Sequence, residues 1–441
     1  MNSPATADTV IEARWVVPVE PARAIFANHA VVITDGRIAA MLPIAEARLR
    51  FIPRERIELP AHALIPGLVN LHTHASMTLM RGLADDLALM DWLNNHIWPA
   101  EMKHVSDKFV YDGSALACAE MLRGGVTCFN DMYFFPQATA RAASDAGMRA
   151  AVGMIVTEFA SPYASDAQDY LAKGLALRDE MRGNPLISFC LAPHAPYTVS
   201  DASLRQVSTF ASELDLPVHI HVHETTAEIE QSMQSHGKRP LKRLAELGLL
   251  GPNLIAVHSI HLEAAEIDLY AQHGCHVAHC PSSNLKLASG IAPVAALIKS
   301  GINVGLGTDG AASNNRLDLL NEMRLAALLA KGTTADPTTL TSWQALEMAT
   351  LSGARALGLE KNIGSLAVGK YADIAAVRMD EIETSPCYDP HSHLVYASGR
   401  EQVSHVWVNG KLLLDERRLT TLDAHEIIAN ASYWHERITN P

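Results

Sequence analysis

The chain has 441 residues, of which 48% are hydrophobic, and its formal net charge is -13. A chain of this length can bury a large core, and a single barrel of about 250 residues would leave enough sequence for a second, smaller domain. The acidic balance and the lack of arginine-rich runs exclude the basic surface that nucleic acid binding requires.

Targeting signals and structural cysteine patterns are also missing from the sequence. The segment 1–8 contains no basic stretch followed by an apolar core, and no window approaches the roughly 18 apolar residues of a membrane helix. The six cysteines are scattered and form no C-x-x-C pair, which argues against a disulfide framework or a zinc ribbon. We therefore expect a soluble cytoplasmic protein with reduced thiols and with neither nucleic acid nor a membrane as partner.

The chain opens with short β-like segments at residues 15–19, 30–34 and 37–42. The turn residues Asp35 and Gly36 separate the last two, which is typical of a hairpin. These segments are therefore predicted to form a small antiparallel sheet rather than units of a barrel.

From Pro66 onward, apolar strand-like segments alternate with helical ones. Helix boundaries support the alternation: Ser106 precedes a helical segment that stops at Gly124, and Thr225 with Glu228 forms a capping-box pattern. Eight parallel strands that alternate with helices predict a (β/α)8 barrel of the α/β class. The predicted strand cores lie at residues 66–72, 126–131, 149–156, 186–193, 217–223, 253–259, 275–280 and 302–308.

After about residue 365 the sequence returns to β-like segments, at residues 374–377, 403–409 and 411–414. Both chain ends are therefore β-rich, whereas the middle is not. We expect the two ends to pack together as a small β-sandwich domain made of residues 1–65 and 366–441, beside a barrel of residues 66–365.

Metal-capable side chains gather at the predicted carboxyl ends of the strands, where a barrel places its site. The segment from Pro66 ends in His72 and His74, which share one face because side chains alternate along a strand. A lone histidine at such a place is more often a hydrogen-bonded core residue than a ligand, but the conjunction on several strands favours a metal site. Further candidates are His194, His219, His221, His223 with Glu224, His258, His261, His276, His279 and Asp309.

Five separated motifs resemble those of the amidohydrolase superfamily, and within it the branch of purine deaminases and triazine chlorohydrolases. They occur in the family's order and extend over nearly the whole chain. The motifs are Pro66–His74, His221-x-x-Glu224, Val257–Ser259, Ser283–Leu287 and Gly307–Asn315.

The resemblance implies that His72, His74, His221 and Asp309 are the ligands of one divalent ion, which we expect to be zinc. Alternation alone does not choose among the three histidines of the fifth strand, and the family's H-x-x-E spacing selects His221. Relatives with two metals use a lysine at the end of the fourth strand. The corresponding segment here has none, so a single-metal site is expected.

Roles for the remaining groups follow from the chemistry of water activation. A bound ion can lower the pKa of water from about 16 to about 7. Asp309 can accept the proton, His258 can hold the attacking hydroxide or the developing oxyanion, and Glu224 can carry a proton to a ring nitrogen and then to the departing amine. The alternative for Glu224 is a charge favoured by the N-terminus of a helix.

The segment 91–101 resembles the lid of methylthioadenosine and S-adenosylhomocysteine deaminases. The resemblance implies that Glu101 binds ribose hydroxyls, that His194 contacts the nucleoside and that Trp92 flanks it. The alternatives are that Trp92 and Trp98 only pack in the lid and that Glu101 is a solvated loop charge.

The third-strand segment contains Arg149 as its only arginine, whereas relatives that bind the homocysteine carboxylate use arginines in the region after the third strand. We therefore expect a preference for the uncharged methylthio group, with Met154 near it. The leading hypothesis is zinc-dependent deamination of 5'-methylthioadenosine, with S-adenosylhomocysteine and adenosine as slower substrates. Alternatives are a deaminase or chlorohydrolase of another heterocycle (guanine, cytosine or a triazine) and a non-catalytic scaffold. The resemblance also allows a homo-oligomer.

Overall fold

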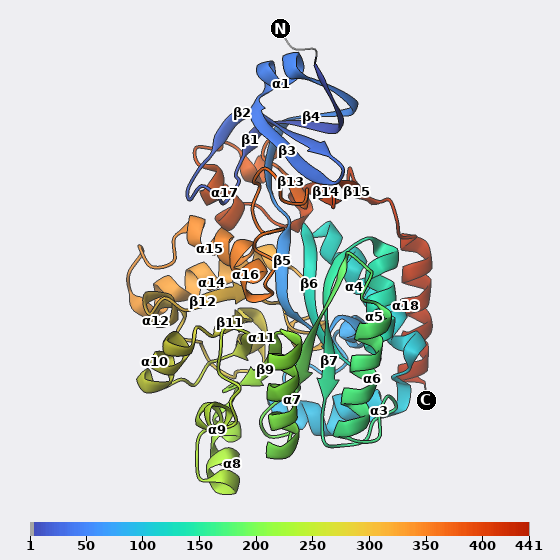
Figure 1. Cartoon of the computed structure of the whole chain (residues 1–441), viewed down its shortest axis with the longest axis vertical. Coiled ribbons are helices and arrows are strands. Elements are labelled where there is room, and N and C mark those ends of the chain that lie inside the picture. The colour runs from blue at the N-terminus through green and yellow to red at the C-terminus, as the bar shows by residue number, and fades with distance from the viewer. Residues whose placement is uncertain (1–3, 441) are drawn as a thin grey trace.

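The computed structural model describes residues 4–440 and contains two eight-stranded sheets. Figure 1 shows the first strands of the chain and the last strands together at one end of the molecule, with the helix-covered barrel at the other. No helix within residues 4–440 combines the length and the apolar character that a membrane crossing needs. The six cysteines are all free, as the sequence predicted.

The barrel sheet consists of eight strands in sequence order, and each is parallel to the next. All eight predicted strands are present, because each is an almost uninterrupted buried segment between two layers. The strands are β5 (Leu68–Thr73), β6 (Val126–Tyr133), β7 (Arg149–Val156), β8 (Ile187–Pro193), β9 (Val218–Val222), β10 (Leu254–His258), β11 (His276–His279) and β12 (Asn303–Leu306).

Two glycines let β12 approach β5, where the first and last strands of the barrel meet. A Cβ atom on Gly305 would lie 2.7 Å from Leu71 Cδ2, and one on Gly307 would lie 2.8 Å from the Cβ of His72. Just beyond β12, the Asp309 amide donates to the His72 carbonyl at 3.0 Å. This close approach brings the end of β12 next to the histidines that end β5.

Helices surround the barrel, and their predicted ends are confirmed at both tested places. Ser106 caps α4, whose C-cap is Gly124, and Thr225 caps α8. The helices between the barrel strands and after them are α4 (Asp107–Arg123), α5 (Pro136–Ala146), α6 (Ala167–Glu180), α7 (Asp201–Leu214), α8 (Thr226–His236), α9 (Pro240–Glu246), α10 (Ala264–His273), α11 (Pro281–Lys286), α12 (Val294–Lys299), α13 (Ala311–Asn314), α14 (Leu319–Thr334), α15 (Ser342–Met348) and α16 (Leu351–Ala356).

The second sheet joins both ends of the chain, which confirms the small terminal β domain. Its strand order is β16-β15-β14-β13-β4-β1-β2-β3, and β4 pairs with β1 from the N-terminal part and with β13 from the C-terminal part. The strands are β1 (Ala5–Val16), β2 (Phe26–Thr34), β3 (Arg37–Pro43), β4 (Phe51–Pro66), β13 (Ile374–Arg378), β14 (Val403–Val408), β15 (Lys411–Asp415) and β16 (Arg418–Leu419), with α1 (Ile44–Arg50), η3 (Ile382–Thr384), α17 (Pro390–Tyr396) and η4 (Arg400–Gln402) as short connections.

Two features of this terminal sheet differ from the sequence prediction. The first strand ends at Val16 instead of occupying residues 15–19, and β4 was not predicted. The part of β4 up to Pro60 is mostly exposed or half-buried and contains Pro53 and Pro60, so it lacks the alternation of a half-buried strand. This segment forms a strand because it pairs with β1, which is distant in the sequence.

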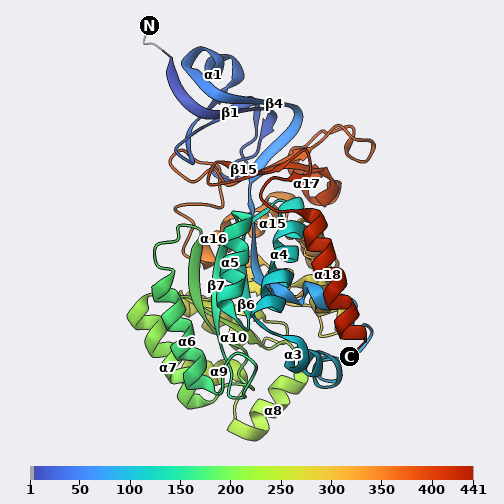
Figure 2. The ribbon, with the colours of Figure 1, turned by 90° about the vertical axis from the view of Figure 1, so that its right-hand side faces the viewer.

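A long C-terminal helix, α18 (Ala424–Thr439), was also not predicted. It lies along the barrel beside α4, where Trp434 Nε1 donates to Asp112 Oδ2 at 2.7 Å (Figure 2). We propose the division into residues 1–65 with 366–441 and residues 66–365 on the basis of the two sheets. Within the C-terminal segment, α18 packs mainly against α4 of the barrel.

A buried ion pair connects the barrel to the terminal segment. Arg149, at the start of β7, donates from Nε and Nη2 to the Asp373 carboxylate at 3.0 and 3.2 Å, and both side chains are almost fully buried. Asp373 also accepts the backbone amide of Asn409 at 2.8 Å. Arg149 thus serves the contact between the two sheets.

Removal of this carboxylate is expected to destabilise the fold strongly. Asp373→Ala leaves the Arg149 charge buried without a partner, a change that costs about 3–5 kcal/mol of unfolding free energy. Urea unfolding followed by circular dichroism measures the difference. Asp380→Ala, at an exposed position of the same segment, is the matched control and should change the unfolding free energy by about 0.5 kcal/mol or less. Equal midpoints for the two variants would contradict the structural role.

Candidate active site

The carboxyl ends of β5 and β12 bring two histidines and one aspartate together. His72 Nε2 and His74 Nε2 each lie 3.2 Å from Asp309 Oδ1. The register between β5 and β6 shifts between Asn70 and Thr73, so β5 carries an irregularity just before its end. Such a bulge re-aims the side chains that follow it.

The end of β9 adds a third histidine to this group. His221 Nε2 lies 3.2 Å from His72 Nε2, and the donor atoms of His72, His221 and His258 all fall within 4.8 Å of one another. The donor atoms of His72, His74 and Asp309 form a second group of the same size. The structure therefore brings the four predicted metal ligands together, with His258 beside them.

Each imidazole in the group has its second nitrogen occupied by the protein. His74 Nδ1 donates to the Met132 carbonyl at 2.6 Å, and His221 Nδ1 donates to the His194 carbonyl at 2.7 Å. These bonds leave the Nε2 lone pairs directed at the centre, as metal-binding histidines require. His72 Nδ1 lies 2.9 Å from His219 Nε2, so His219 orients a candidate ligand instead of joining the group.

Protonation of these groups also fits a cation site. Burial lowers the pKa of His72 to about 4 and that of His221 well below its usual value, which keeps both rings in the neutral form that binds metals. Burial disfavours a charge on His74 too, but the hydrogen bond with Asp309 outweighs it and raises the pKa to about 9. A divalent cation competes with that proton for the same two donor atoms, so the donor set fits a divalent metal ion.

Asp309 is held by residues of the sequence motifs for which the sequence predicted no role. The hydroxyls of Ser283 and Ser313 donate to its Oδ2 at 2.6 and 3.0 Å, and the Gly310 amide donates to Oδ1 at 2.8 Å. Asp309 itself has a positive φ of 61°. The carboxylate is thus fixed in direction by three donors on a strained backbone, which is common at functional sites.

Glu224 lies two residues after the end of β9 and is buried, with 8% of its surface exposed. Its carboxylate is 3.8 Å from His258 Nε2, and burial raises its pKa. His258 is oriented by Asn284 Oδ1, 2.8 Å from His258 Nδ1. The arrangement places a carboxyl that can hold a proton beside the candidate metal group, as the sequence predicted.

Glu228 contributes to this site in a way that the sequence did not reveal. The capping-box pattern predicted that its side chain reaches back to Thr225. The carboxylate instead accepts the backbone amides of His223 and Glu224, at 3.1 and 2.9 Å. The backbone of the strand end that carries His221 and Glu224 is therefore fixed by the first turn of α8.

A small cavity of about 80 Å³ lies over these groups. The lid helices cover it, and they are η1 (Ala75–Met80), α2 (Leu89–Trp92), η2 (Leu93–Ile97) and α3 (Trp98–His104). Trp92, Glu101 and His194 all line the cavity together with the candidate metal ligands His74, His221 and Asp309 and with Glu224 and His258.

Glu101 is not a solvated loop charge. It is buried, it accepts the Tyr133 hydroxyl at 2.6 Å, and burial raises its pKa to about 7. His194 Nδ1 lies 3.1 Å from Thr198 Oγ1, and burial lowers the pKa of His194 to about 3. Trp92 is buried among the lid side chains. All three residues line the small cavity, and their contacts with a substrate stay a prediction.

A larger cavity of about 950 Å³ adjoins the small one on its outer side. Both are lined by Trp98, Phe134, Phe159 and Tyr197 together with Glu101, so this aromatic group separates them. The Trp98 and Phe159 ring centres are 6.2 Å apart. The aromatic group therefore stands between the outer cavity and the candidate metal group.

The position predicted for Met154 is wrong. Met154 lies in the layer between the barrel and its helices, where it packs against Gly174 of α6, whereas its neighbour Ile155 lines the small cavity. Side chains alternate along β7, and Ala151 lies in the cluster inside the barrel, so the odd-numbered residues face inward.

The other histidines lie outside the group of donor atoms. His223 Nδ1 donates to the His261 carbonyl and its Nε2 accepts the Leu241 amide, so it connects loops. His276 Nε2 is 3.0 Å from the Pro252 carbonyl at the opposite end of the barrel. His279 is buried on β11. The geometry thus selects among the histidines that the sequence left as candidates.

The family profile of the amidohydrolases matches residues 63–413 of the chain. The chain belongs to the amidohydrolase family. This amidohydrolase is 48% identical to the 5-methylthioadenosine/S-adenosylhomocysteine deaminase of Teredinibacter turnerae, over 99% of each chain. Its structure matches that of an adenosine deaminase from Xanthomonas campestris with bound zinc, with a TM-score of 0.98 and 49% identity over 99% of this chain and 100% of that one.

The guanine deaminase of Escherichia coli shares the fold of this amidohydrolase, with a TM-score of 0.83 at 22% identity over 92% of this chain and 99% of that one. The family and fold expected from the five sequence motifs are confirmed. The amidohydrolase is therefore a (β/α)8 hydrolase with a small β domain and a donor set suited to a divalent metal ion.

Proposed function

We propose that this amidohydrolase is a zinc-dependent hydrolytic deaminase that converts 5'-methylthioadenosine, and more slowly S-adenosylhomocysteine or adenosine, to the inosine derivative and ammonia. The observation that carries the proposal is the buried Glu224 carboxyl beside the donor group of His72, His74, His221 and Asp309. A second acid/base next to a metal site is what removal of a poor amine leaving group needs. The names of the relatives support the same activity.

Four side chains would hold the ion, and two others would manage the reacting groups. Bound there, a divalent ion makes water acidic enough to react as hydroxide near neutral pH. Asp309 accepts a proton from the water, and its second oxygen stays fixed by Ser283 and Ser313. His258, oriented by Asn284, stabilises the negative charge that develops on the attacking oxygen.

Glu224 moves protons on the substrate side. Its raised pKa lets the carboxyl donate a proton to a ring nitrogen of the purine, which makes the adjacent ring carbon electrophilic. The water oxygen forms a bond to that carbon. A proton is then delivered to the exocyclic amine, the carbon–nitrogen bond breaks, and ammonia leaves. The amine keeps its two protons and gains one from the water, the second water proton replaces the proton that Glu224 gave to the ring nitrogen, and the water oxygen stays on the product, so the reaction balances.

The nucleoside would lie across the small cavity and the adjoining outer cavity, with its sugar toward the lid. Glu101, already bonded to Tyr133, has a carboxylate oxygen free to accept from ribose hydroxyls. His194 and Trp92 would flank the nucleoside on either side of the cavity.

The outer cavity supports a preference for an uncharged 5' substituent. Among its lining residues the only arginine is Arg243, which pairs with Asp201 at 2.7 Å and also donates to the carbonyls of Pro196 and Val199. The carboxylates of Glu158 and Glu228 line the same cavity. No described guanidinium is therefore free there to bind the carboxylate of a homocysteine group, and 5'-methylthioadenosine is the preferred substrate.

An ultraviolet absorbance assay across a nucleoside panel tests the activity. 5'-Methylthioadenosine, S-adenosylhomocysteine and adenosine are each expected to react, in that order of kcat/KM, and a chelator is expected to stop all three reactions. Added zinc should restore turnover. Turnover of guanine or a chlorinated triazine without turnover of the nucleosides would contradict the proposal.

Glu101→Gln is expected to raise the KM for 5'-methylthioadenosine by about 10- to 100-fold with a smaller effect on kcat. The variant weakens hydrogen bonds from ribose hydroxyls to a charged acceptor, each worth about 1.5–3 kcal/mol. Steady-state kinetics with a ribonucleoside and its 2'-deoxy analogue measure the effect, which should shrink for the analogue. Glu230→Gln, at an exposed position of α8, is the matched control. An unchanged KM would exclude Glu101 from the sugar site.

A further inference from the structure

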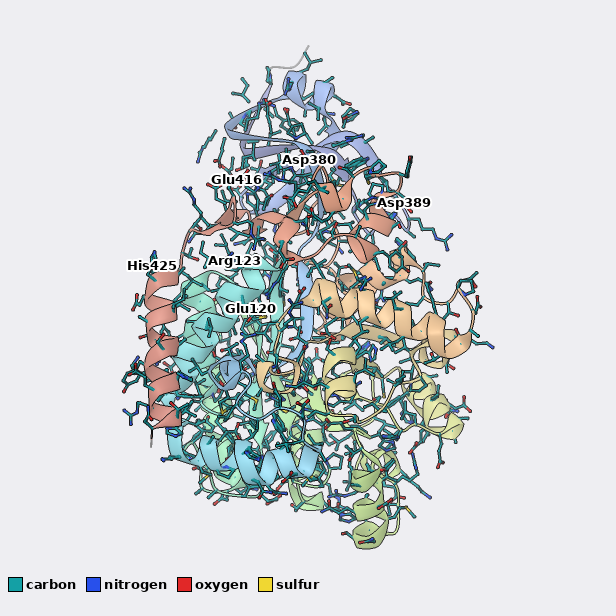
Figure 3. The ribbon with its side chains drawn as sticks, turned by 180° about the vertical axis from the view of Figure 1, so that it is seen from behind. Glu120, Arg123, Asp380, Asp389, Glu416 and His425 are labelled. Atoms are coloured by element: carbon teal, nitrogen blue, oxygen red, sulfur yellow. The ribbon has the colours of Figure 1, made fainter. Side chains whose placement is uncertain are left out.

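A third cavity, of about 600 Å³, lies away from the active site. The last turn of α4, the loop after α13, the C-terminal strands and the start of α18 enclose it. Figure 3 shows Glu120 and Arg123 at the end of α4, below the C-terminal strands, with His425 in the first turn of α18 beside them. Within the described structure, the arginines that line this cavity are Arg81, Arg123, Arg316, Arg400 and Arg417.

The charge of this cavity opposes that of the whole protein. Five arginines line it, but only two carboxylates do, whereas the chain has a formal net charge of -13. One of the two acids, Glu120, is already shared between Arg81 and Arg400, and its Oε1 is 3.0 Å from Arg400 Nη1. The other, Glu401, is largely exposed.

Two of the arginines have no acidic partner. Within residues 4–440, no carboxylate pairs with Arg123 or Arg417, while Arg316 has only a distant contact of 3.9 Å with Asp318. Arg417 is held in place through Nη1, which donates to the carbonyls of Arg400 and Val403 at 2.6 and 2.8 Å. Burial, helped by the neighbouring Arg123, lowers the pKa of Arg417.

The rest of the cavity lining is largely apolar. Leu116 of α4, Leu419 of β16 and Ile427 and Ile428 of α18 contribute to it. The cap residue of α18, Asp423, already accepts the amides of His425 and Glu426, so the arginines and not the helix end provide the attraction for an anion. A volume of about 600 Å³ is within the usual range for small-molecule sites and exceeds what an inorganic anion fills.

We propose that this cavity binds a small molecule that carries a phosphate group on an apolar body. The planar guanidinium group matches phosphate oxygens two at a time, and several arginines around one cavity suit a doubly charged phosphate better than a singly charged carboxylate. The phosphate would lie between Arg123, Arg316 and Arg417, and the apolar body would cover Leu116 and Ile427. The net acidity of the remaining surface disfavours an extended nucleic acid in this place.

The cavity is connected to the two segments that follow the candidate ligands His74 and Asp309. Arg81 ends η1, the helix that begins directly after His74, and it donates to the Asn315 carbonyl. Asn315 ends α13, which begins two residues after Asp309. A ligand in this cavity therefore lies next to the segments that follow His74 and Asp309, two of the candidate metal ligands.

Isothermal titration calorimetry on the full-length, metal-loaded protein at constant ionic strength tests the site. The probes are inorganic phosphate and phenyl phosphate, whose ring supplies an apolar body. We expect saturable binding of both, with phenyl phosphate the tighter. Arg123→Ala/Arg316→Ala should weaken binding at least about tenfold, because each charge-assisted hydrogen bond to phosphate contributes about one power of ten or more.

Two comparisons keep the result decisive. Both substituted side chains are exposed, so the double variant should fold, and its circular dichroism spectrum should match that of the unaltered protein. Arg205→Ala, at an exposed position of α7, is the control and should leave both dissociation constants unchanged. Equal affinities in the double variant and the unaltered protein, no saturable binding, or an oligomer that dissociates only in the double variant would overturn the proposal.

Discussion

Glu224→Gln is expected to lower kcat for 5'-methylthioadenosine by about 10²–10⁴-fold while the protein keeps its metal ion. This range is the usual contribution of a positioned general acid or base. Glutamine keeps the shape of the side chain but cannot release or take up a proton, so the purine ring would not be activated. The amide also removes the charge next to His258, 3.8 Å away.

Absorbance kinetics and elemental analysis of the same sample separate loss of chemistry from loss of the ion. We expect stoichiometric metal in Glu224→Gln with little turnover, because Glu224 is not among the candidate ligands. Glu230→Gln provides the control for a neutralised glutamate, here on the exposed face of α8. Undiminished kcat in Glu224→Gln would show that another group carries the proton, while loss of the metal would place Glu224 among its ligands.

The barrel and much of the site could be predicted because both depend on local sequence. Each barrel strand is buried on both sides and is therefore a short, nearly uninterrupted apolar segment such as β6 or β7. In a parallel barrel the carboxyl ends of all strands meet, so residues that end different strands, such as His72, His221 and Asp309, had to approach one another. Their distances in the structure follow from this rule.

The features that escaped prediction depend on contacts between distant segments. The first half of β4 is a strand because it pairs with β1, and α18 is held against α4 by the hydrogen bond from Trp434 to Asp112. Glu228 was expected to complete a cap of its own helix, yet it accepts amides from the preceding strand end. Met154 was placed on the wrong face because a continuous apolar strand does not reveal which of its two faces lies inward.

The residues that orient the candidate metal ligands could not be predicted from the sequence either. Ser283 and Ser313 belong to motifs that the sequence revealed, but their common partner, Asp309 Oδ2, is defined only once α11 and α13 are placed. His219 shares a face with His221 on β9, and only the position of β5 shows that it contacts His72. Sequence patterns thus identify the residues at the strand ends more readily than they identify which residue orients which.

Asp309→Asn is expected to remove the metal ion and to lower kcat by about 10³-fold or more. The substitution keeps the side-chain volume but deletes the one negative charge among the four candidate ligands, and metal-assisted activation of water contributes several kcal/mol to such reactions. His72 and His74 would then face a neutral amide in place of the carboxylate oxygen that lies 3.2 Å from each Nε2. Dialysis followed by elemental analysis measures occupancy, and absorbance kinetics measure turnover.

Ser283→Ala is the graded comparison for this variant, because it removes one of the three donors that fix Asp309 and leaves the carboxylate charge in place. Loss of such a supporting group usually costs about 10–100-fold in metal affinity or activity, so added zinc should rescue Ser283→Ala but not Asp309→Asn. If instead Asp309→Asn retained stoichiometric metal and full turnover, Asp309 would be neither a ligand nor the acceptor of the water proton. The hydrolysis would then need a different base, and no other described carboxylate lies within 4 Å of His72 and His74.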